Sequence, residues 1–337
     1  MAEIDDSPPR RPTIYDLAQI AGTSPSAVSA VLNGSWKKRR ISTRLAERIS
    51  RIAEEQGYAV NLQASMLRRE RSRIIGMIIP KYDNRYFGAI AEGFEAMARE
   101  RGLFPVITCT QRDPALEVEA AREMMSYQAE CLIATGATDP DRIANICTSA
   151  GVRSINLDLP GTTAPSVVSD NFQAARDLTR FILERIKQDF GVLAPLYFIG
   201  GRAQDHNTRE RLRGFICAHE DMGLTVPSAY CFMHGYSASK TEAALAETGI
   251  DERCGMFINS TIALEGFVRW FHSLAAPPEF RFGCFDWDPF ARFLPQNIGM
   301  MRQDVDTMLA KVFEFVEHAP SGTVNIKIPC IFEAANG

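Results

Sequence analysis

The strongest constraint on the fold is an alternation of two hydrophobic patterns, which begins at Ile74 and continues toward the end of the chain. Short runs rich in β-branched and aromatic residues are separated by longer segments whose apolar residues recur at helical spacing. The short runs occupy residues 74–79, 104–108, 131–135, 154–157, 196–199, 231–233, 256–258 and 282–285. Such alternation predicts parallel sheets with helices on both faces. Residues 74–337 are too many for one compact sheet, so we predict two doubly wound α/β lobes.

Sheets of this kind bind ligands beyond the carboxyl ends of their strands, and two lobes leave a cleft between those ends. The candidate ligand-binding residues therefore directly follow predicted strands. They are Tyr86 and Phe87 in the loop 82–87, Asp158, the pair Asp170 and Asn171, and the pair Asp286 and Trp287. An aromatic face against a ligand ring, with carboxylates that accept bonds from hydroxyls, is typical of sugar sites. Simpler roles stay open, because an Asp at a strand end is often a helix N-cap and an aromatic residue at a helix start is often core.

Residues 13–57 show a different pattern, in which three short segments have apolar residues at helical spacing. Thr13 is the predicted N-cap of the first helix, and Gly22 ends that helix. Ser24 is positioned to cap a second helix that begins at Pro25, where a missing N–H does no harm. Two short helices joined at a turn that contains glycine, and packed on a third helix, form a helix-turn-helix.

The second helix of such a motif enters the major groove of DNA. Its predicted inward stripe is apolar and consists of Val28, Val31 and Leu32. The opposite face carries small side chains, which are Ser26, Ser29, Ala30 and Asn33. An ordinary three-helix surface domain is the alternative that this pattern alone leaves open.

The charges of the chain are divided unequally. Residues 10–73 hold 13 Lys and Arg against 5 Asp and Glu, whereas residues 74–337 hold 24 against 33. The basic run 37–40 includes Lys37 and Arg39, which are well placed for contacts with phosphates. A basic head on an acidic body predicts a polyanion, such as double-stranded DNA, as the partner of the head.

The sequence lacks the fingerprints of common catalytic and cofactor sites. It contains no GxGxxG, GxxxxGK[ST] or GxSxG motif. The eight cysteines form no CxxC pair and the five histidines show no HxxxH spacing, which argues against a zinc site and a disulfide framework. No apolar run reaches the length of a membrane span, and the N-terminus lacks an apolar signal core. We therefore predict a cytoplasmic protein that is not an enzyme and needs no cofactor or metal.

Three segments together carry a resemblance to a known family. They are TIYDLAQIAGTSPSAVSAVLNG at 13–34, ISTRLAERISRIAEEQGYAVNLQASMLR at 41–68 and IIGMIIPKYDNRYF at 74–87. With these segments in this order, the chain resembles the lactose-repressor (LacI/GalR) family of bacterial transcription regulators. The resemblance covers nearly the whole chain and is most specific in the first segment.

The resemblance implies that Pro25, Ser26 and Ala30 read bases and that Ser29 contacts a phosphate. Thr13, Ser24 and Asn33 are the other expected DNA contacts of the three helices. The family often has an arginine at the position of Ala30, where it could read a guanine. The alanine therefore implies an operator that differs from the usual one.

Residues 61–67 resemble the family's hinge helix, which contacts the minor groove of DNA. Asn61 and Ala64 are the implied contacts, and Leu67 is the implied wedge that opens a base step and kinks the site. Val60 and Ser65 depart from the common proline and arginine, which would weaken this contact. The alternative for Leu67 is a linker leucine packed on the body.

Arg211, in the segment 198–215, resembles the arginine that binds effector oxygens in the family. Its planar fork suits a hydroxyl pair or a carboxylate; an ion pair with Glu210 or Glu220 is the alternative. Asn259 and Ser260 stand where the family commonly has Asn-Asp or Ser-Asp. Because Ser260 carries no charge, this position favours an anionic effector, such as a sugar acid or a sugar phosphate.

The resemblance implies a regulator, expected to be a repressor, that binds a pseudo-palindromic operator as a homodimer and responds to a sugar, sugar acid or sugar phosphate. Its expected parts are a tail at 1–10, a helix-turn-helix domain at 11–59, a hinge helix and linker at 60–73 and a periplasmic-binding-protein-like body at 74–337. The expected N-lobe is 74–172 plus 303–323, and the C-lobe is 173–302 plus 324–337. The alternatives are a cytoplasmic sugar-binding protein and an architectural DNA-binding protein with a vestigial pocket.

Overall fold

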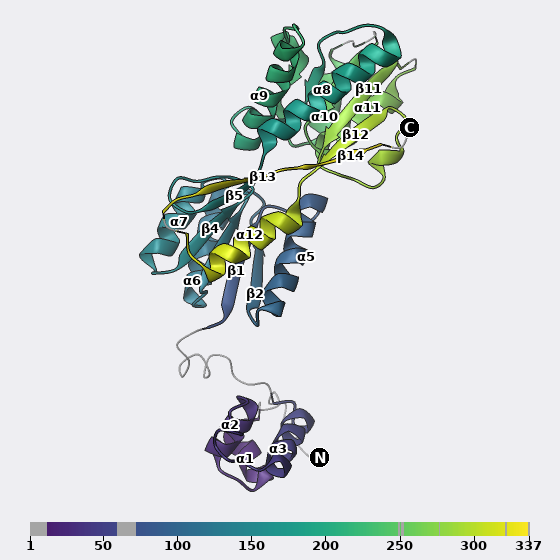
Figure 1. Ribbon diagram of the computed structural model, residues 1–337. Helices are drawn as coiled ribbons and strands as arrows, with labels where there is room; N and C mark the ends of the chain where they lie inside the picture. The colour runs from purple at the N-terminus through teal and green to yellow at the C-terminus, as the bar shows by residue number, and fades with distance from the viewer. Residues whose placement is uncertain are drawn as a thin grey trace, which may run out of the picture. The chain divides into compact units, whose positions relative to one another are not determined.

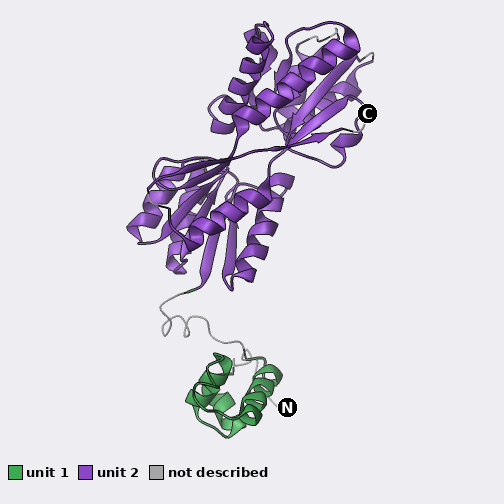
Figure 2. Ribbon diagram, in the orientation of Figure 1, with its two compact units in different colours: residues 1–72 green, residues 73–337 purple. Residues whose placement is uncertain are grey.

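The structure is a computed structural model that describes residues 12–58, 72–248, 250, 253–275, 277–320 and 322–335. The chain divides into two compact units, residues 1–72 and residues 73–337, which Figure 2 colours separately. We call the first unit the head and the second unit the body. Within the described ranges, no helix combines the length and the apolar character that a membrane crossing requires.

The head contains three helices, which are α1 (Ile14–Ala21), α2 (Pro25–Leu32) and α3 (Thr43–Glu55). Each helix starts after a hydroxyl side chain that accepts a hydrogen bond from a backbone N–H three residues on, and these caps are Thr13, Ser24 and Ser42. Gly22 ends α1 with a φ of 60°, in the left-handed region that glycine adopts without strain. The apolar core of the head takes side chains from all three helices, including Leu17, Val28 and Ile49.

The first lobe of the body is a six-stranded parallel sheet in the order β13-β5-β4-β3-β1-β2. Its strands are β1 (Ile74–Ile79), β2 (Phe104–Cys109), β3 (Cys131–Thr135), β4 (Arg153–Leu157), β5 (Ser166–Ser169) and β13 (Asn325–Ile328). Its helices are α5 (Arg85–Glu100), α6 (Pro114–Ser126), α7 (Pro140–Ser149) and α12 (Val305–Glu317). Because successive residues of a strand point to opposite faces of its sheet, Met77 of β1 packs with α5 and α12 on one face, whereas Gly76 faces Met124 of α6 on the other.

The second lobe is a six-stranded sheet in the order β14-β12-β11-β10-β6-β8, in which only β14 is antiparallel. Its strands are β6 (Tyr197–Ile199), β8 (Cys231–Phe232), β10 (Cys254–Ile258), β11 (Phe280–Phe285), β12 (Asn297–Arg302) and β14 (Ile331–Ala334). Its longer helices are α8 (Asn171–Phe190), α9 (His206–Asp221), α10 (Ala238–Ala246) and α11 (Thr261–Ser273). Smaller elements are β7 (Gly201–Arg202), β9 (His234–Gly235) and the 3-10 turns η1 (Ser228–Tyr230) and η2 (Ala291–Phe293). Separate apolar clusters cover the two faces of this sheet, and the predicted fold class is confirmed.

Three connections join the lobes, from β5 to α8, from β12 to α12 and from β13 to β14, and Figure 1 shows β13 and β14 as one extended stretch. The third connection corrects the predicted lobe boundary at residue 324. Residues 325–328 form β13, which pairs in parallel with β5 of the first lobe. The run NIKI has the alternating polarity of an edge strand, and this pattern does not indicate which of two sheets it joins.

Candidate nucleic-acid interface and ligand cleft

The α2 helix presents a surface of small polar groups. Ser24, Ser26 and Asn33 are exposed, and Pro25 and Ser29 are half-buried. The Asn33 side-chain amide donates to the Ser29 hydroxyl over 3.1 Å. A helix surface without bulky side chains allows close approach to base edges in a major groove.

Ala30 does not belong to this exposed surface, which corrects the prediction that it reads bases. It is only 3% exposed. The chain turns back onto α2 after its last residue, and both the backbone N–H and the hydroxyl of Ser35 donate to the Ala30 carbonyl. Ala30 lies four residues after Ser26 and therefore on nearly the same helix face, but the returning chain at Ser35 leaves it buried.

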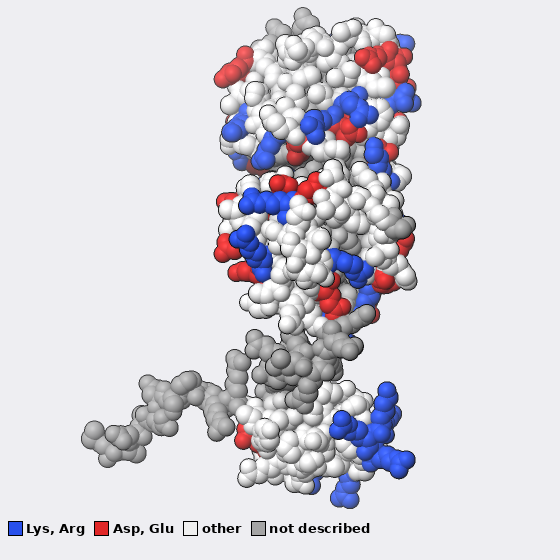
Figure 3. All heavy atoms as spheres, turned by 90° about the vertical axis from the view of Figure 1, so that its left-hand side faces the viewer, with Lys and Arg blue, Asp and Glu red and all other residues white. Residues whose placement is uncertain are grey.

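The basic run of the head is exposed. Lys37, Lys38, Arg39 and Arg40 all lie in the turn between α2 and α3 and reach solvent. Figure 3 shows Lys and Arg side chains projecting from one side of the head. Solvated cations that project from the turn after a recognition helix are suited to contacts with DNA phosphates.

The predicted hinge contacts Asn61, Ala64 and Leu67 lie outside the described residues. The described body begins directly after this segment. There the backbone N–H of Arg73 donates to the Glu130 carboxylate over 2.7 Å, which ties the start of the body to the first lobe.

The predicted ligand-binding residues of the body lie beyond the carboxyl ends of strands from both lobes. Tyr86 and Phe87 follow β1, Asp158 follows β4, Asn259 and Ser260 follow β10, and Asp286 and Trp287 follow β11. Arg211 lies on α9. Asn84 caps α5, and its side chain accepts hydrogen bonds from the backbone N–H groups of Tyr86 and Phe87. This cap fixes the start of the helix and so the position of the two aromatic residues.

Asp158 links the two lobes. Its Oδ1 accepts hydrogen bonds from the Tyr86 hydroxyl of the first lobe, at 3.2 Å, and from the Asn207 side-chain amide of the second lobe, at 3.0 Å. Asp158 is 3% exposed and has a φ of 75°, a conformation that non-glycine residues rarely adopt. Burial raises the pKa of the Asp158 carboxyl to about 6, against the opposing charge of Arg112. A strained and desolvated carboxylate at a cleft is typical of functional sites.

Arg211 is 3% exposed and is held on three sides. Its Nε donates to Asn171 Oδ1 and its terminal nitrogen donates to the Asn259 carbonyl, each over 2.7 Å. Its guanidinium carbon lies 3.5 Å from the centre of the Phe285 ring. Glu210 instead pairs with Arg213 and Lys327. Arg211 therefore presents its remaining N–H groups from a fixed position, as a ligand-binding fork requires.

Asn259 and Ser260 have different roles at the end of β10. The Ser260 hydroxyl accepts from the Ala263 N–H and caps α11, and Ser260 is only 2% exposed. The Asn259 amide nitrogen lies 3.4 Å from the Thr208 hydroxyl. Its side-chain oxygen is buried without a partner in the described part of the chain. A Cβ at Gly201 would lie 2.4 Å from the Asn259 amide, so this approach requires glycine there.

A chain of hydrogen bonds connects Asp286 of the second lobe to Ser169 of the first lobe. Gln303 donates to Asp286 Oδ1 over 2.6 Å, and the Ser169 hydroxyl donates to Gln303 over 2.6 Å. Burial raises the pKa of Asp286, against the opposing charge of Arg211. Trp287 is half-buried and lines a cavity of about 400 Å³ together with Tyr86, Asp286 and Gln303.

Several polar residues of the cleft had no role in the sequence prediction. They are Arg112, Asn207, Thr208, Tyr236 and Gln303. Asn207 lies four residues before Arg211 on α9, and this spacing would have placed both side chains on one helix face. Tyr236 follows the two-residue strand β9, which no sequence pattern predicts.

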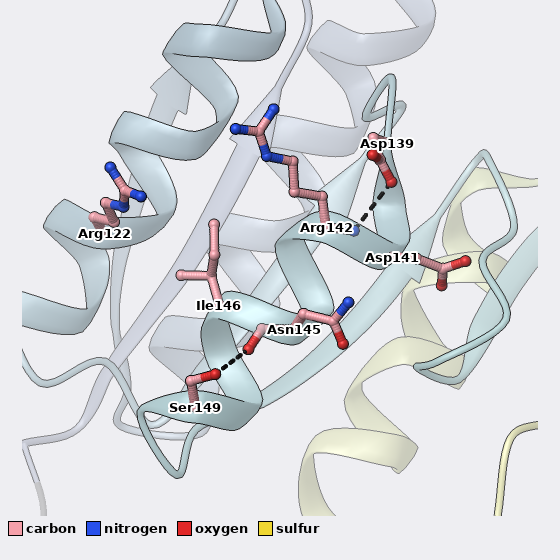
Figure 4. Close-up of a pocket in the computed structure, with 7 residues that line it drawn as sticks. All are labelled: Arg122, Asp139, Asp141, Arg142, Asn145, Ile146 and Ser149. Carbon is pink, nitrogen blue, oxygen red and sulfur yellow. Dashed lines mark hydrogen bonds between the residues drawn. The ribbon is translucent and has the colours of Figure 1, made fainter.

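A second hollow lies on the first lobe, between α6 and α7, and is shown in Figure 4. It is lined by Arg122, Asp139, Asp141, Arg142, Asn145, Ile146 and Ser149. Asp139 caps α7 through the Arg142 N–H, and Asp141 accepts bonds from the loop residues Thr162 and Thr163. These carboxylates stabilise their own helix and loop, so the hollow lacks the convergent polar groups of the cleft.

Comparison with known families gives two matches. Residues 13–61 match the family described as bacterial regulatory proteins, lacI family. Residues 75–255, more than half of the chain, match the family described as periplasmic binding protein domain.

Two repressors are similar in sequence. The ribitol operon repressor of Klebsiella aerogenes is 64% identical over 190 residues, which cover 56% of this chain and 70% of that protein. The sucrose operon repressor of Klebsiella pneumoniae is 28% identical over 274 residues, which cover 77% of this chain and 78% of that protein.

Two solved structures are similar in fold. The lac repressor dimer bound to operator and the anti-inducer ONPF has a TM-score of 0.77 at 18% identity, with 97% of this chain and 99% of that chain covered. The CelR regulator in complex with cellobiose has a TM-score of 0.67 at 18% identity, with 97% and 100% covered.

Proposed function

Because the chain belongs to the lacI family of bacterial regulatory proteins, we propose that it represses an operon for polyol metabolism and that a ribitol-like polyol is its effector. The chain is a DNA-binding transcriptional regulator whose operator affinity depends on a small molecule. The finer assignment is supported by the relative with 64% identity, which is named for the ribitol operon.

The polar groups of the cleft support a neutral polyhydroxyl effector. Asn259 offers a buried oxygen without a partner, Asp158 and Asp286 offer carboxylate oxygens, and Arg211 offers N–H groups. A hydroxyl both donates and accepts, so a polyol can bond to groups of each kind. The charges of Arg112 and Arg211 already act on the carboxylates Asp158, Asp205 and Asp286. Arg85 and Arg302, which also line the cavity, pair with Asp288 and Glu333, and this pairing disfavours an added anion. This charge balance favours a polyol over the sugar acid or sugar phosphate that Ser260 suggested.

We assign operator binding to the head and hinge, with a helix-turn-helix domain at 11–59, a hinge at 60–73 and a body from 74. The exposed α2 surface from Ser24 to Asn33, without Ala30, would contact the bases. Lys37 and Arg39 would contact phosphates, and Asn61, Ala64 and Leu67 would contact the minor groove. A two-fold operator needs two heads, so we propose a homodimer.

We further propose that the protein works in the bacterial cytoplasm, where its operator is located, and that it catalyses no reaction. A ligand shifts operator affinity only through different affinities for two states of the body. Release from the operator by the polyol would allow expression of enzymes that consume that polyol.

The test uses the full-length protein. DNA fragments that it selects from a random pool are sequenced, and its affinity for the selected site is measured by fluorescence anisotropy with and without ribitol. We expect a pseudo-palindromic site and weaker binding when millimolar ribitol is present. Failure to select any site would contradict DNA binding by the head. Unchanged affinity with ribitol, together with a response to a sugar phosphate, would contradict the effector assignment alone.

A further inference from the structure

Arg112 lies in an unusual loop at the edge of the first lobe. The loop joins the end of β2 to the start of α6. Gln111 and Arg112 have φ values of 53° and 57°, so two consecutive non-glycine residues adopt the left-handed conformation. This conformation costs roughly 1–2 kcal/mol per residue and persists only where the surroundings hold it. Strain of this kind is concentrated at ligand-binding sites.

The side chain of Arg112 reaches from the first lobe to the second. Its guanidinium lies 3.8 Å from the carboxylate of Asp205, which directly precedes α9. Both side chains are largely buried, with exposed fractions of 17% for Arg112 and 10% for Asp205. The guanidinium carbon lies 5.9 Å from the centre of the Phe87 ring and 5.8 Å from that of the Tyr236 ring. The residue therefore contacts aromatic groups from both lobes.

The hydrogen-bonding capacity of Arg112 is unused. A guanidinium has five N–H donors, yet none of them has an acceptor within hydrogen-bond distance in the described part of the chain. The approach to Asp205 is a long ion pair. The Asp205 carboxylate itself accepts a bond from the Tyr236 hydroxyl over 3.0 Å. The Arg112 nitrogens are not among the fully buried atoms of the described residues, so their N–H groups are open to the oxygens of a ligand in the cleft.

Arg112 also acts on the residues that line the cleft. Burial raises the pKa of Asp158 to about 6, and the charge of Arg112 is the main effect that opposes this shift. The charges of Arg112 and Arg211 both lower the pKa of Tyr236, which burial raises to about 12. The two guanidiniums therefore act on the same group of cleft residues, although they come from different lobes.

We propose that Arg112 is an effector-binding residue that selects the length of the polyol. Its N–H groups would donate to the oxygens at one end of the chain while its charge faces Asp205 across the cleft. Arg211 of the second lobe would hold the other end, so a shorter polyol bound at Arg211 would lose the contact with Arg112. The proposal rests on the proposed function, because it requires a polyol in this cleft. A planar fork matches two neighbouring hydroxyl oxygens, whereas the carboxylates nearby disfavour an acidic end group.

The test is isothermal titration of full-length protein with ribitol and with erythritol, which has one carbon and one hydroxyl fewer. Arg112→Gln should weaken ribitol binding about 10-fold or more, as expected for the loss of bonds to a charged donor. Arg112→Lys keeps the charge but loses the fork, so it should weaken binding by a smaller factor. Both variants should lose more affinity for ribitol than for erythritol. The control is Arg122→Gln, which changes an exposed arginine of α6 and should leave both affinities unchanged.

The possible results separate this proposal from the proposed function. If the unmodified protein binds ribitol and Arg112→Gln binds it equally well, Arg112 is a structural residue and the proposal is overturned, while the polyol effector stands. Should Arg112→Gln fail to fold, unchanged ribitol affinity in Arg112→Lys overturns the proposal in the same way. If the unmodified protein binds neither polyol, the proposed effector is wrong and the proposal falls with it. An equal loss of affinity for both polyols would contradict selection by chain length.

Discussion

Asp158→Asn should make the unliganded protein more stable and its effector binding weaker. The asparagine side-chain oxygen can accept the same two bonds, from Tyr86 and Asn207, that Asp158 accepts. Asparagine also tolerates the φ of 75° at this position. The substitution therefore removes a buried charge with little change in geometry. It also removes a charged acceptor from the cleft, so ribitol affinity should fall about 10-fold or more.

The gain in stability can be worked out from the pKa of Asp158. Its usual pKa is 3.8, and burial raises the value in the folded protein to about 6. Between these pH values the folded state binds more protons than the unfolded chain, so the free energy of unfolding falls as pH rises through this window. Relative to a side chain that does not titrate, Asp158 then costs about 3 kcal/mol at pH 7.5, where it is ionised in the folded protein, and about 1 kcal/mol at pH 4.5, where it must take up a proton on folding. Asp158→Asn should recover these amounts.

Urea denaturation of both proteins at the two pH values measures this difference. A matched control is Asp113→Asn, which changes an exposed N-cap of α6 where asparagine caps equally well. The control should change the free energy of unfolding by less than about 0.5 kcal/mol at either pH. The reasoning would be refuted if Asp158→Asn destabilised the protein, or if its effect were the same at pH 7.5 and pH 4.5.

Three further predictions address packing, the head and its charges. Gly214→Ala should lower the free energy of unfolding by about 2 kcal/mol or more in urea denaturation, because the new Cβ would lie 2.2 Å from a backbone oxygen of α8. Gly88→Ala, whose Cβ meets nothing closer than 3.6 Å, should be neutral or stabilising by up to about 1 kcal/mol. Thr13→Ala removes the reciprocal capping box of α1 and should destabilise the head by about 1 kcal/mol. Amide hydrogen exchange in α1 should then be faster, and unchanged exchange would contradict a stabilising cap at Thr13. Lys37→Gln and Arg39→Gln each remove two phosphate contacts from the proposed dimer, so each should reduce the slope of log operator affinity against log salt by about 1.8, and an unchanged slope would exclude a phosphate contact.

Local sequence signals were sufficient for the parts of the fold that depend on neighbouring residues. Thr13 and Ser24 cap the helices that were predicted to follow them, because a cap needs only a hydroxyl and a backbone N–H three residues away. The eight predicted β-rich runs all lie within or overlap strands. The ends of these strands indicated the cleft residues Asp158 and Asp286, since parallel topology brings carboxyl ends to one edge of a sheet.

The parts that were missed depend on contacts between distant segments. The partner strand of β13 is set by pairing with β5, and nothing in the run NIKI indicates that partner. Ala30 is buried by the chain that follows α2, so its face could not be judged from helical spacing alone. Arg112 comes from a loop without a recognisable motif, and its position near Asp205 exists only when the two lobes approach each other.

The bonds across the cleft suggest how effector binding and lobe position are coupled. The side chains of Asp158 and Asn207, of Arg112 and Asp205, and of Arg85 and Asp288 each join the first lobe to the second. Asp158 and Arg112 are also groups that a polyol would bond to in the proposed site. An effector must therefore replace some of these bonds, and its affinity is the difference between the bonds formed and those lost. Because the lost bonds fix the approach of the lobes, any such exchange changes the relative free energies of their arrangements, which is the condition for a ligand to alter operator affinity.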